Sequence, residues 1–156
     1  MSDNIQKMTQ KSQEAMQAAA RLAESKRNST VEPEHLILEL IEQVDGIVPR
    51  VLQEMKVIPK GLIQSLNKSI SLFPQLGKAQ DNTYASARLQ KVFKQAEAEA
   101  LQMKDEYIST EHFMLAAFNS DDSEIKNFLK VNGLKKSDFI SALQKEKEKK
   151  KVNSDQ

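Results

Sequence analysis

The sequence contains one short pattern twice. Residues 31–41 read VEPEHLILELI, and residues 108–118 read ISTEHFMLAAF. Each stretch places a Glu-His pair at the start of an apolar run with helical spacing. In the first copy, Pro33 suits the first position of a helix. The Glu-His pair is therefore either a piece of chemistry, such as a metal ligand beside a general base, or the start of a structural helix.

The match extends in both directions without a gap. A shift of 77 residues aligns Leu52 with Leu129 and, upstream, Ala19 with Ala96. A gapless series of matches on helical core positions predicts a duplicated four-helix unit. Two units are too few for a stable open solenoid, so we expect them to pack as one pseudo-twofold domain. A pseudo-twofold arrangement also makes a groove, or a pair of matching surface sites, between the units.

Helical spacing along almost the whole chain predicts an all-α fold of about eight helices. Thr9 is a plausible N-cap for the first helix. We expect one domain over 1–146, with repeat one at about 5–72, a linker at 73–82 and repeat two at about 83–146. The charged segment 147–156 predicts a frayed helix end that runs into a disordered linker. The expected helices begin at Thr9, at Pro33 and at Pro59, cover about 47–56, 83–104, 109–119 and 123–132, and begin again near 137.

Composition excludes several classes of protein. The chain has 156 residues and a net charge of +1, which gives no electrostatic footprint for a nucleic acid. No apolar run approaches the roughly 20 residues that span a bilayer. Cysteine is absent, which excludes disulfides, thiolate metal sites and cysteine nucleophiles. A soluble domain without membrane or nucleic-acid partners is expected, with a cytoplasmic location as the default.

The chain lacks the parts of a recognisable catalytic or metal site. A zinc-peptidase helix needs a second histidine four residues after the first, but Glu39 and Ala116 stand at those positions. No phosphate-binding glycine loop occurs. We therefore expect His35 and His112 to pack near helix starts and to hydrogen-bond nearby backbone. No catalytic residue, metal or cofactor is predicted for this domain, which we expect not to be an enzyme.

The two glutamates, Glu34 and Glu111, have both a structural and a functional explanation. Glu34 and Glu111 lie in the first turn of their helices, where the helix dipole favours a carboxylate. That structural explanation is one alternative. The other is that two carboxylates at equivalent surface positions recognise a cationic group, which is a binding role rather than a catalytic one.

The order of these pieces, repeated twice, resembles the Clp N-terminal domain, the double-repeat helical module that precedes the ATPase rings of Clp chaperones. The matching pieces are Thr9 at the first helix start, VEPEHLILELI, Val51-Leu52 with the Val57-Ile58 turn, and the second repeat from Leu89 to Leu143. The likeness covers roughly residues 5–146. The polar residues from Lys151 onward are similar to the linker of the ClpB disaggregase branch, whereas GIVPRVLQEMKV also resembles the ClpA and ClpC branch.

The resemblance implies a function for the domain. Domains of this family sit on a hexameric AAA+ ring, joined by a flexible linker, and capture unfolded or aggregated polypeptide or adaptor proteins. ATP and magnesium belong to the ATPase modules, and the isolated domain is expected to be monomeric. A Thr, Asp and Glu cluster that supports chaperone activity in ClpB-like domains falls on Thr9, Asp105 and Glu111. In the ClpC branch, the Glu of each Glu-His pair binds phosphorylated arginine, which implies Glu34 and Glu111. An adaptor- or phosphoarginine-binding domain of a ClpA- or ClpC-type protease unfoldase is therefore the alternative.

One feature departs from the family pattern. The substrate groove of ClpB-like domains is lined partly by leucines on the long fifth helix. Here that helix is expected to carry Gln95, Glu97 and Glu99 on its outward positions. The apolar residues that remain as candidates for substrate binding are Phe93, Leu101 and Met103.

Overall fold

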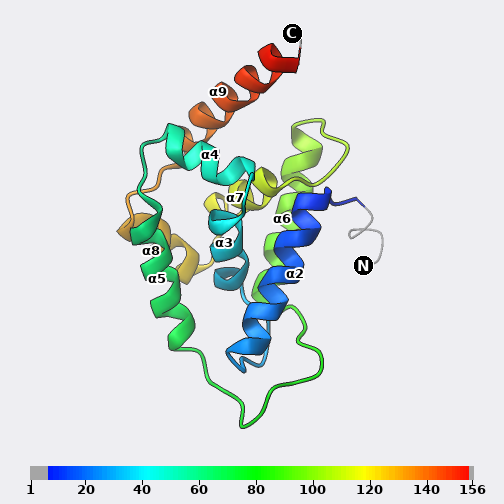
Figure 1. Cartoon of the computed structure of the whole chain (residues 1–156), viewed down its shortest axis with the longest axis vertical. Helices are drawn as coiled ribbons and strands as arrows, with labels where there is room; N and C mark the ends of the chain where they lie inside the picture. Colours follow the sequence, from blue (N-terminus) through cyan, green and yellow to red (C-terminus); the bar gives the residue numbers. More distant parts are fainter. Residues whose placement is uncertain (1–6, 155–156) are drawn as a thin grey trace.

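The computed structural model describes residues 7–154, without the side chains of 152–154, and shows an all-α domain (Figure 1). The predicted fold class is confirmed. Residues 5 and 6 of the predicted first repeat, and residues 155–156 of the predicted linker, lie outside the described part. Eight helices are found within residues 7–154: α2 Gln10–Ser25, α3 Pro33–Glu42, α4 Ile47–Glu54, α5 Pro59–Ser71, α6 Ala87–Gln102, α7 Thr110–Phe118, α8 Ser123–Val131 and α9 Lys136–Ser154.

Equivalent residues begin and end equivalent helices in the two repeats. The Thr9 hydroxyl accepts a hydrogen bond from Ser12 N at the start of α2, and the Ser86 hydroxyl, 77 residues later, caps α6 in the same way. Arg27 and Lys104, which follow α2 and α6, share a left-handed backbone with φ of 56° and 59°. The duplication thus preserves backbone conformation even where the residue type differs.

Two short backbone bridges join the repeats crosswise. Met8 pairs with Ile108, and Val31 pairs with Ala85, both in parallel orientation. A shift of 77 residues turns Met8 into Ala85 and Val31 into Ile108, so each bridge is the pseudo-twofold copy of the other. The start of each repeat is therefore held by the other repeat, and the two units form a single domain as predicted.

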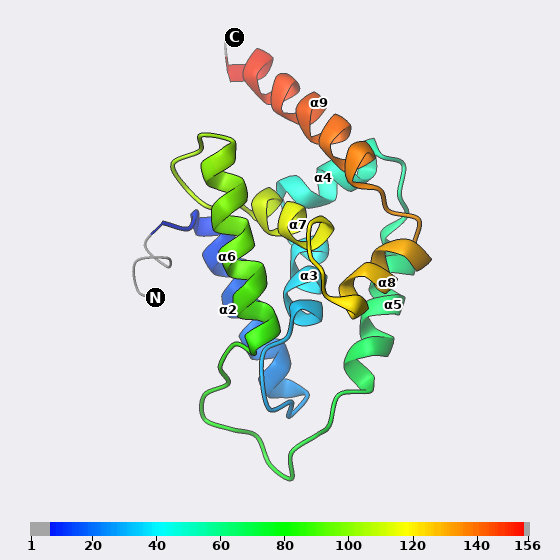
Figure 2. The same cartoon turned by 180° about the vertical axis from the view of Figure 1, so that it is seen from behind.

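The two Glu-His helices form the centre of this domain. Helices α3 and α7 are buried along most of their length, as expected for helices that are apolar on nearly all sides. Helix α2 packs on α3, and α6 packs on α7. In both views, α2 and α6 lie on the same flank of the molecule (Figures 1 and 2). Leu115, a predicted core residue on α7, is only 4% exposed.

The end of the chain differs from the prediction. Helix α9 continues to Ser154 and projects from the body of the domain, so residues 147–154 are helical rather than disordered (Figure 2). Lysine and glutamate are good helix formers. In addition, the Lys149 ammonium lies 3.3 Å from Glu146 on α9 and 2.8 Å from Glu54 on α4. These pairings depend on the fold and are not visible in the composition.

Within residues 7–154, no helix has the length and apolar character required to cross a bilayer.

Candidate functional site

Both histidines close a hydrogen-bonded cap at the start of their helix. The backbone N–H of Glu32 donates to His35 Nδ1 at 2.9 Å, and that of Ser109 donates to His112 Nδ1 at 2.8 Å. In each case the side chain of the N-cap residue in turn accepts from the backbone of the histidine. This reciprocal arrangement is a capping box with histidine in place of the usual Glu or Gln. The prediction that the histidines hydrogen-bond nearby backbone is confirmed.

The cap also fixes the proton on each ring. Because a backbone N–H can only donate, Nδ1 accepts and the neutral ring carries its proton on Nε2. That proton is donated to Asn28 Oδ1 from His35 and to Asp105 Oδ2 from His112, at 2.9 and 2.8 Å. Burial lowers the pKa of His35 to about 4. Both nitrogens of each ring are engaged, and the described residues contain no cluster of three side chains able to hold a metal.

The turn between α6 and α7 gathers the three residues implied by the Clp resemblance. Thr9 donates its backbone N–H to Ile108 O at 3.1 Å, which attaches the start of α2 to this turn. Asp105 is fixed on the turn by its bond from His112, and Glu111 directly precedes that histidine. Thr9 and Asp105 are thus each hydrogen-bonded to the segment 105–112, and Glu111 lies in that segment by its position in the sequence.

Glu111 is buried and already has a cationic partner. Its side chain is 8% exposed, and its carboxylate lies 3.4 Å from the Lys147 ammonium of α9. Lys147 itself is 38% exposed, so this pair is open to solvent on the lysine side. A single contact to a flexible lysine is a weak electrostatic restraint.

Glu34, the equivalent residue in repeat one, has a much tighter partner. The Arg88 guanidinium donates two hydrogen bonds to Glu34, at 3.1 and 2.9 Å, and two to Asp122, at 2.7 and 3.0 Å. Glu32 accepts another at 3.1 Å, and Glu124 lies 3.4 Å away. Burial raises the pKa of Glu34, whereas hydrogen bonding to the guanidinium lowers the pKa of Asp122. We call these five residues the Arg88 cluster.

The expectation of two matching surface carboxylates is therefore wrong. Glu34 and Glu111 are 4% and 6% exposed, because α3 and α7 lie at the centre of the domain. Their cations also differ, since the residue 77 positions before Arg88 is Lys11, which instead bonds the backbone oxygen of Val44. The sequence did not predict the role of Arg88. Its only signal was that the equivalent positions 11 and 88 hold different residues, lysine and arginine.

The predicted apolar residues divide into two groups. Leu101 is 79% exposed and Met103 is 38% exposed at the end of α6, whereas Phe93 is half-buried and packs edge-on against Phe113 with ring centroids 5.3 Å apart. Tyr107 on the following turn is 50% exposed and was not predicted. We call Leu101, Met103 and Tyr107 the α6–α7 patch. It lies on the same turn as Asp105.

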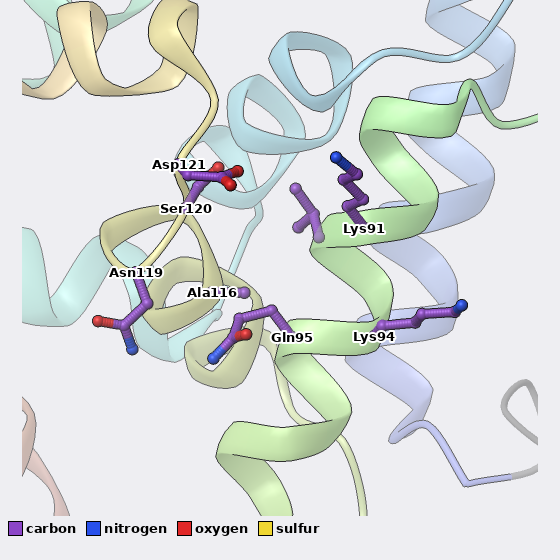
Figure 3. Close-up of a pocket in the computed structure, with 8 residues that line it drawn as sticks. Lys91, Lys94, Gln95, Ala116, Asn119, Ser120 and Asp121 are labelled. Atoms are coloured by element: carbon purple, nitrogen blue, oxygen red, sulfur yellow. The ribbon is translucent and has the colours of Figure 1, made fainter.

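The middle of α6 borders a pocket with both polar and apolar lining residues. Glu99 is 7% exposed, so its predicted outward position is wrong; it shares the buried face of α6 with Val92 and Ala96. Its carboxylate accepts hydrogen bonds from the side-chain amides of Gln95 and Asn119, both at 2.6 Å. Figure 3 shows Gln95 and Asn119 in the lining of the pocket, between α6 and the segment after α7. Its volume is about 380 Å³, and it is lined by Lys91, Val92, Lys94, Gln95, Ala116, Asn119, Ser120 and Asp121.

Two similar curated proteins are ClpB chaperones. The chain is 46% identical over 148 residues to the chaperone protein ClpB of Bdellovibrio bacteriovorus, which covers 95% of the chain. It is 29% identical over 154 residues to the chaperone protein ClpB of Clostridium tetani, which covers 97% of the chain. The chain spans only 17% and 18% of the length of these relatives.

Solved structures share the fold at low sequence identity. The Hsp104 N-terminal domain from Candida albicans superposes with a TM-score of 0.76 at 20% identity, covering 87% of this chain and 88% of that one. A complex of the ClpV N-domain with a VipB peptide superposes with a TM-score of 0.66 at 16% identity, covering 83% and 81%. The family model of the Clp repeat (R) N-terminal domain matches residues 7–132. The chain therefore belongs to the Clp repeat N-terminal domain family.

Proposed function

We propose that this domain recognises substrates for a Clp chaperone of the ClpB type: it binds unfolded or aggregated polypeptide and delivers it to an AAA+ ring. The observation that supports the proposal is the α6–α7 patch, which exposes Leu101 at the end of α6 and Tyr107 on the turn that carries Asp105. An exposed apolar group rimmed by polar residues is typical of an interaction site. In this proposal the domain binds rather than catalyses, and ATP and magnesium act in the ATPase modules of a hexameric protein.

The patch suits weak and unselective binding. Its side chains are few and separated along a turn, so an unfolded segment gains little buried area while losing conformational freedom. Asp105 on the same turn, and Thr9, which bonds Ile108 next to Tyr107, supply polar groups near the patch. Weak contacts allow a client to be released to the ring, in keeping with a delivery role. We place the protein in the cytoplasm and assign it no nucleic-acid or membrane partner.

A second candidate is an adaptor- or phosphoarginine-binding domain of the ClpA or ClpC type. The exchangeable partner of Glu111 favours it, because a client guanidinium could replace the half-exposed Lys147. Glu34 is a poorer candidate, since Arg88 already occupies its carboxylate through two hydrogen bonds. This alternative therefore predicts one cation site per domain rather than two.

A binding experiment tests the first candidate. Fluorescence anisotropy of the labelled domain should rise on addition of a permanently unfolded protein and stay constant with its folded form. Leu101→Ser and Tyr107→Ser should each weaken binding by about tenfold. Ile58→Ser is the matched control, because Ile58 is 76% exposed on a different turn. Equal loss in the control, or equal binding of the folded protein, would contradict the proposal.

A further inference from the structure

Helix α9 changes character after Leu143. Leu143 is buried, and so is Leu66, its equivalent on α5 in repeat one. One turn further on, α5 has Ile70, which is 2% exposed, whereas α9 has Lys147, whose side chain is 38% exposed. Among residues 144–151, whose side chains the structure describes, none is buried. At the position where α5 has a buried apolar anchor, α9 therefore has an ammonium group.

Helix α9 also lies differently from its copy. Helix α5 packs on α3 of its own repeat, whereas α9 packs chiefly on α4 of the other repeat. Arg50 on α4 lies 3.7 Å from Glu146, and the Lys149 ammonium lies 2.8 Å from Glu54. A pocket of about 380 Å³, with Glu54 and Lys145 in its lining, remains at this junction. The end of α9 is therefore held by charge more than by close packing.

A third ion pair joins the end of α9 to the proposed client site. The Lys147 ammonium lies 3.4 Å from Glu111 Oε2 at the start of α7. The Glu111 side chain is 8% exposed and that of Lys147 is 38% exposed, so solvent reaches the pair from the lysine side. A cationic side chain that arrives from solvent therefore competes with Lys147 for the same carboxylate.

The matching carboxylate of repeat one has a fixed cation instead. The Arg88 guanidinium donates two hydrogen bonds to Glu34 and two to Asp122, and its side chain is 28% exposed. Lys147 is more exposed and reaches Glu111 through one ion pair. Such a pair contributes little, because salt screens it and the long lysine side chain loses conformational freedom. Of the two glutamates, Glu111 therefore has the partner that a competing cation can replace.

We propose that Lys147 is a built-in competitor of the client: its ammonium occupies Glu111 in the free domain, and a cationic side chain of a bound client displaces it. Displacement of Lys147 removes one of the three ion pairs at the end of α9, so client binding loosens this end from α4. By thermodynamic linkage, a change that detaches Lys147 strengthens client binding to the same extent. The inference rests on the proposed function, because it takes Glu111 as part of the client site.

A double-mutant cycle tests the competition. The affinity for a permanently unfolded protein is measured at low salt for the wild-type chain, Lys147→Gln, Glu111→Gln and the double variant. We expect Lys147→Gln to bind about threefold more tightly than wild type, and to have no effect in the Glu111→Gln background. Lys136→Gln removes the same charge from the exposed first turn of α9 and should leave the affinity unchanged. An equal gain in Lys136→Gln, unchanged or weaker binding by Lys147→Gln, or a gain that persists without Glu111, would overturn the proposal.

Amide hydrogen exchange tests the link between the client site and α9. In the 156-residue chain, saturation with the unfolded protein should speed exchange at residues 146–150 by about threefold. Lys147→Gln should do the same without the unfolded protein. The end of α5 around Ile70 is the internal control, because its buried apolar anchor should keep its exchange unchanged. Unchanged exchange at 146–150 in both experiments would overturn the link to α9.

The failure of this inference and the failure of the proposed function can be told apart. Binding of the unfolded protein that is weakened by Leu101→Ser but indifferent to Lys147→Gln would keep the client site and remove only the competitor. Absence of binding by both the wild-type chain and Lys147→Gln would remove the proposed function together with the inference. Binding by Lys147→Gln alone would support both.

Discussion

Arg88 and Glu34 join the two repeats through an ion pair that contains two hydrogen bonds. Arg88 lies on α6 in repeat two, Glu34 lies on α3 in repeat one, and their atoms Nη2 and Oε2 are 2.9 Å apart. The Glu34 side chain is 6% exposed, so its charge depends on this partner rather than on water.

Removal of Arg88 should therefore destabilise the domain. Arg88→Gln leaves Glu34 and Asp122 without a cation in a largely buried environment, and we expect a loss of about 3–5 kcal/mol in the free energy of unfolding. Urea denaturation measures this change in the free energy of unfolding. Lys11→Gln, at the equivalent and exposed position of repeat one, should cost at most about 0.5 kcal/mol. Equal losses in the two variants would show that the Arg88 cluster is not a structural link.

His35 should make stability depend on pH. Its pKa is lowered from 6.5 to about 4 in the folded state, so the unfolded state binds the proton first as the pH falls. The contribution of the neutral His35 ring to the free energy of unfolding is fully present above pH 6.5. It is lost as the pH falls from 6.5 through 4, by a total on the order of 3 kcal/mol.

The comparison with His35→Gln isolates this effect. Glu34, with a raised pKa, and Asp122, with a lowered one, titrate in both proteins and cancel in the difference. The wild-type free energy of unfolding should fall more steeply than that of His35→Gln between pH 6.5 and 4. Parallel curves would contradict the assignment of a buried neutral ring.

Leu115→Ala tests the core of repeat two. Leu115 is 4% exposed on the central helix α7, and its truncation should cost about 2–5 kcal/mol. Leu72→Ala is the control, because Leu72 is 77% exposed and its loss should change stability by about 0.5 kcal/mol or less. A small effect of Leu115→Ala would mean that α7 is not the centre of the fold.

Glu111→Gln separates function from stability. It removes the charge beside Lys147 at the N-terminus of α7, which should cost no more than about 1 kcal/mol. We expect it to weaken binding of unfolded polypeptide at the same time. Circular dichroism melts and anisotropy titrations on one sample measure both quantities; unchanged affinity would remove Glu111 from the proposed site.

The fold could be predicted because its determinants are local. Pro33, Pro59 and Thr9 begin their helices where the pattern placed them, and the repeat register implied the pseudo-twofold. Interactions between distant residues could not be read in this way. Arg88 pairs with Glu32 and Glu34 of the other repeat, and Lys149 pairs with Glu54 on another helix. The Arg88 cluster and the continuation of α9 to Ser154 were therefore not predicted.

The candidate site was predicted only in part, because its contacts join residues that are distant in the sequence. Leu101 and Met103 are exposed at the end of α6, and Thr9 bonds Ile108 on the segment that follows Asp105, but the role of these residues in substrate binding stays a prediction. The burial of Glu34 and Glu111 was missed, because the helix dipole explains a first-turn glutamate without indicating how deeply its helix lies.

Amide shift mapping with a permanently unfolded protein tests the central claim most directly. On the ¹⁵N-labelled chain, the account predicts the largest changes at Thr9, Leu101, Asp105 and Tyr107, and their loss in Leu101→Ser while the rest of the spectrum stays unchanged. Changes confined to the polar pocket around Gln95 and Asn119, or no change at saturating concentrations of the unfolded protein, would contradict it.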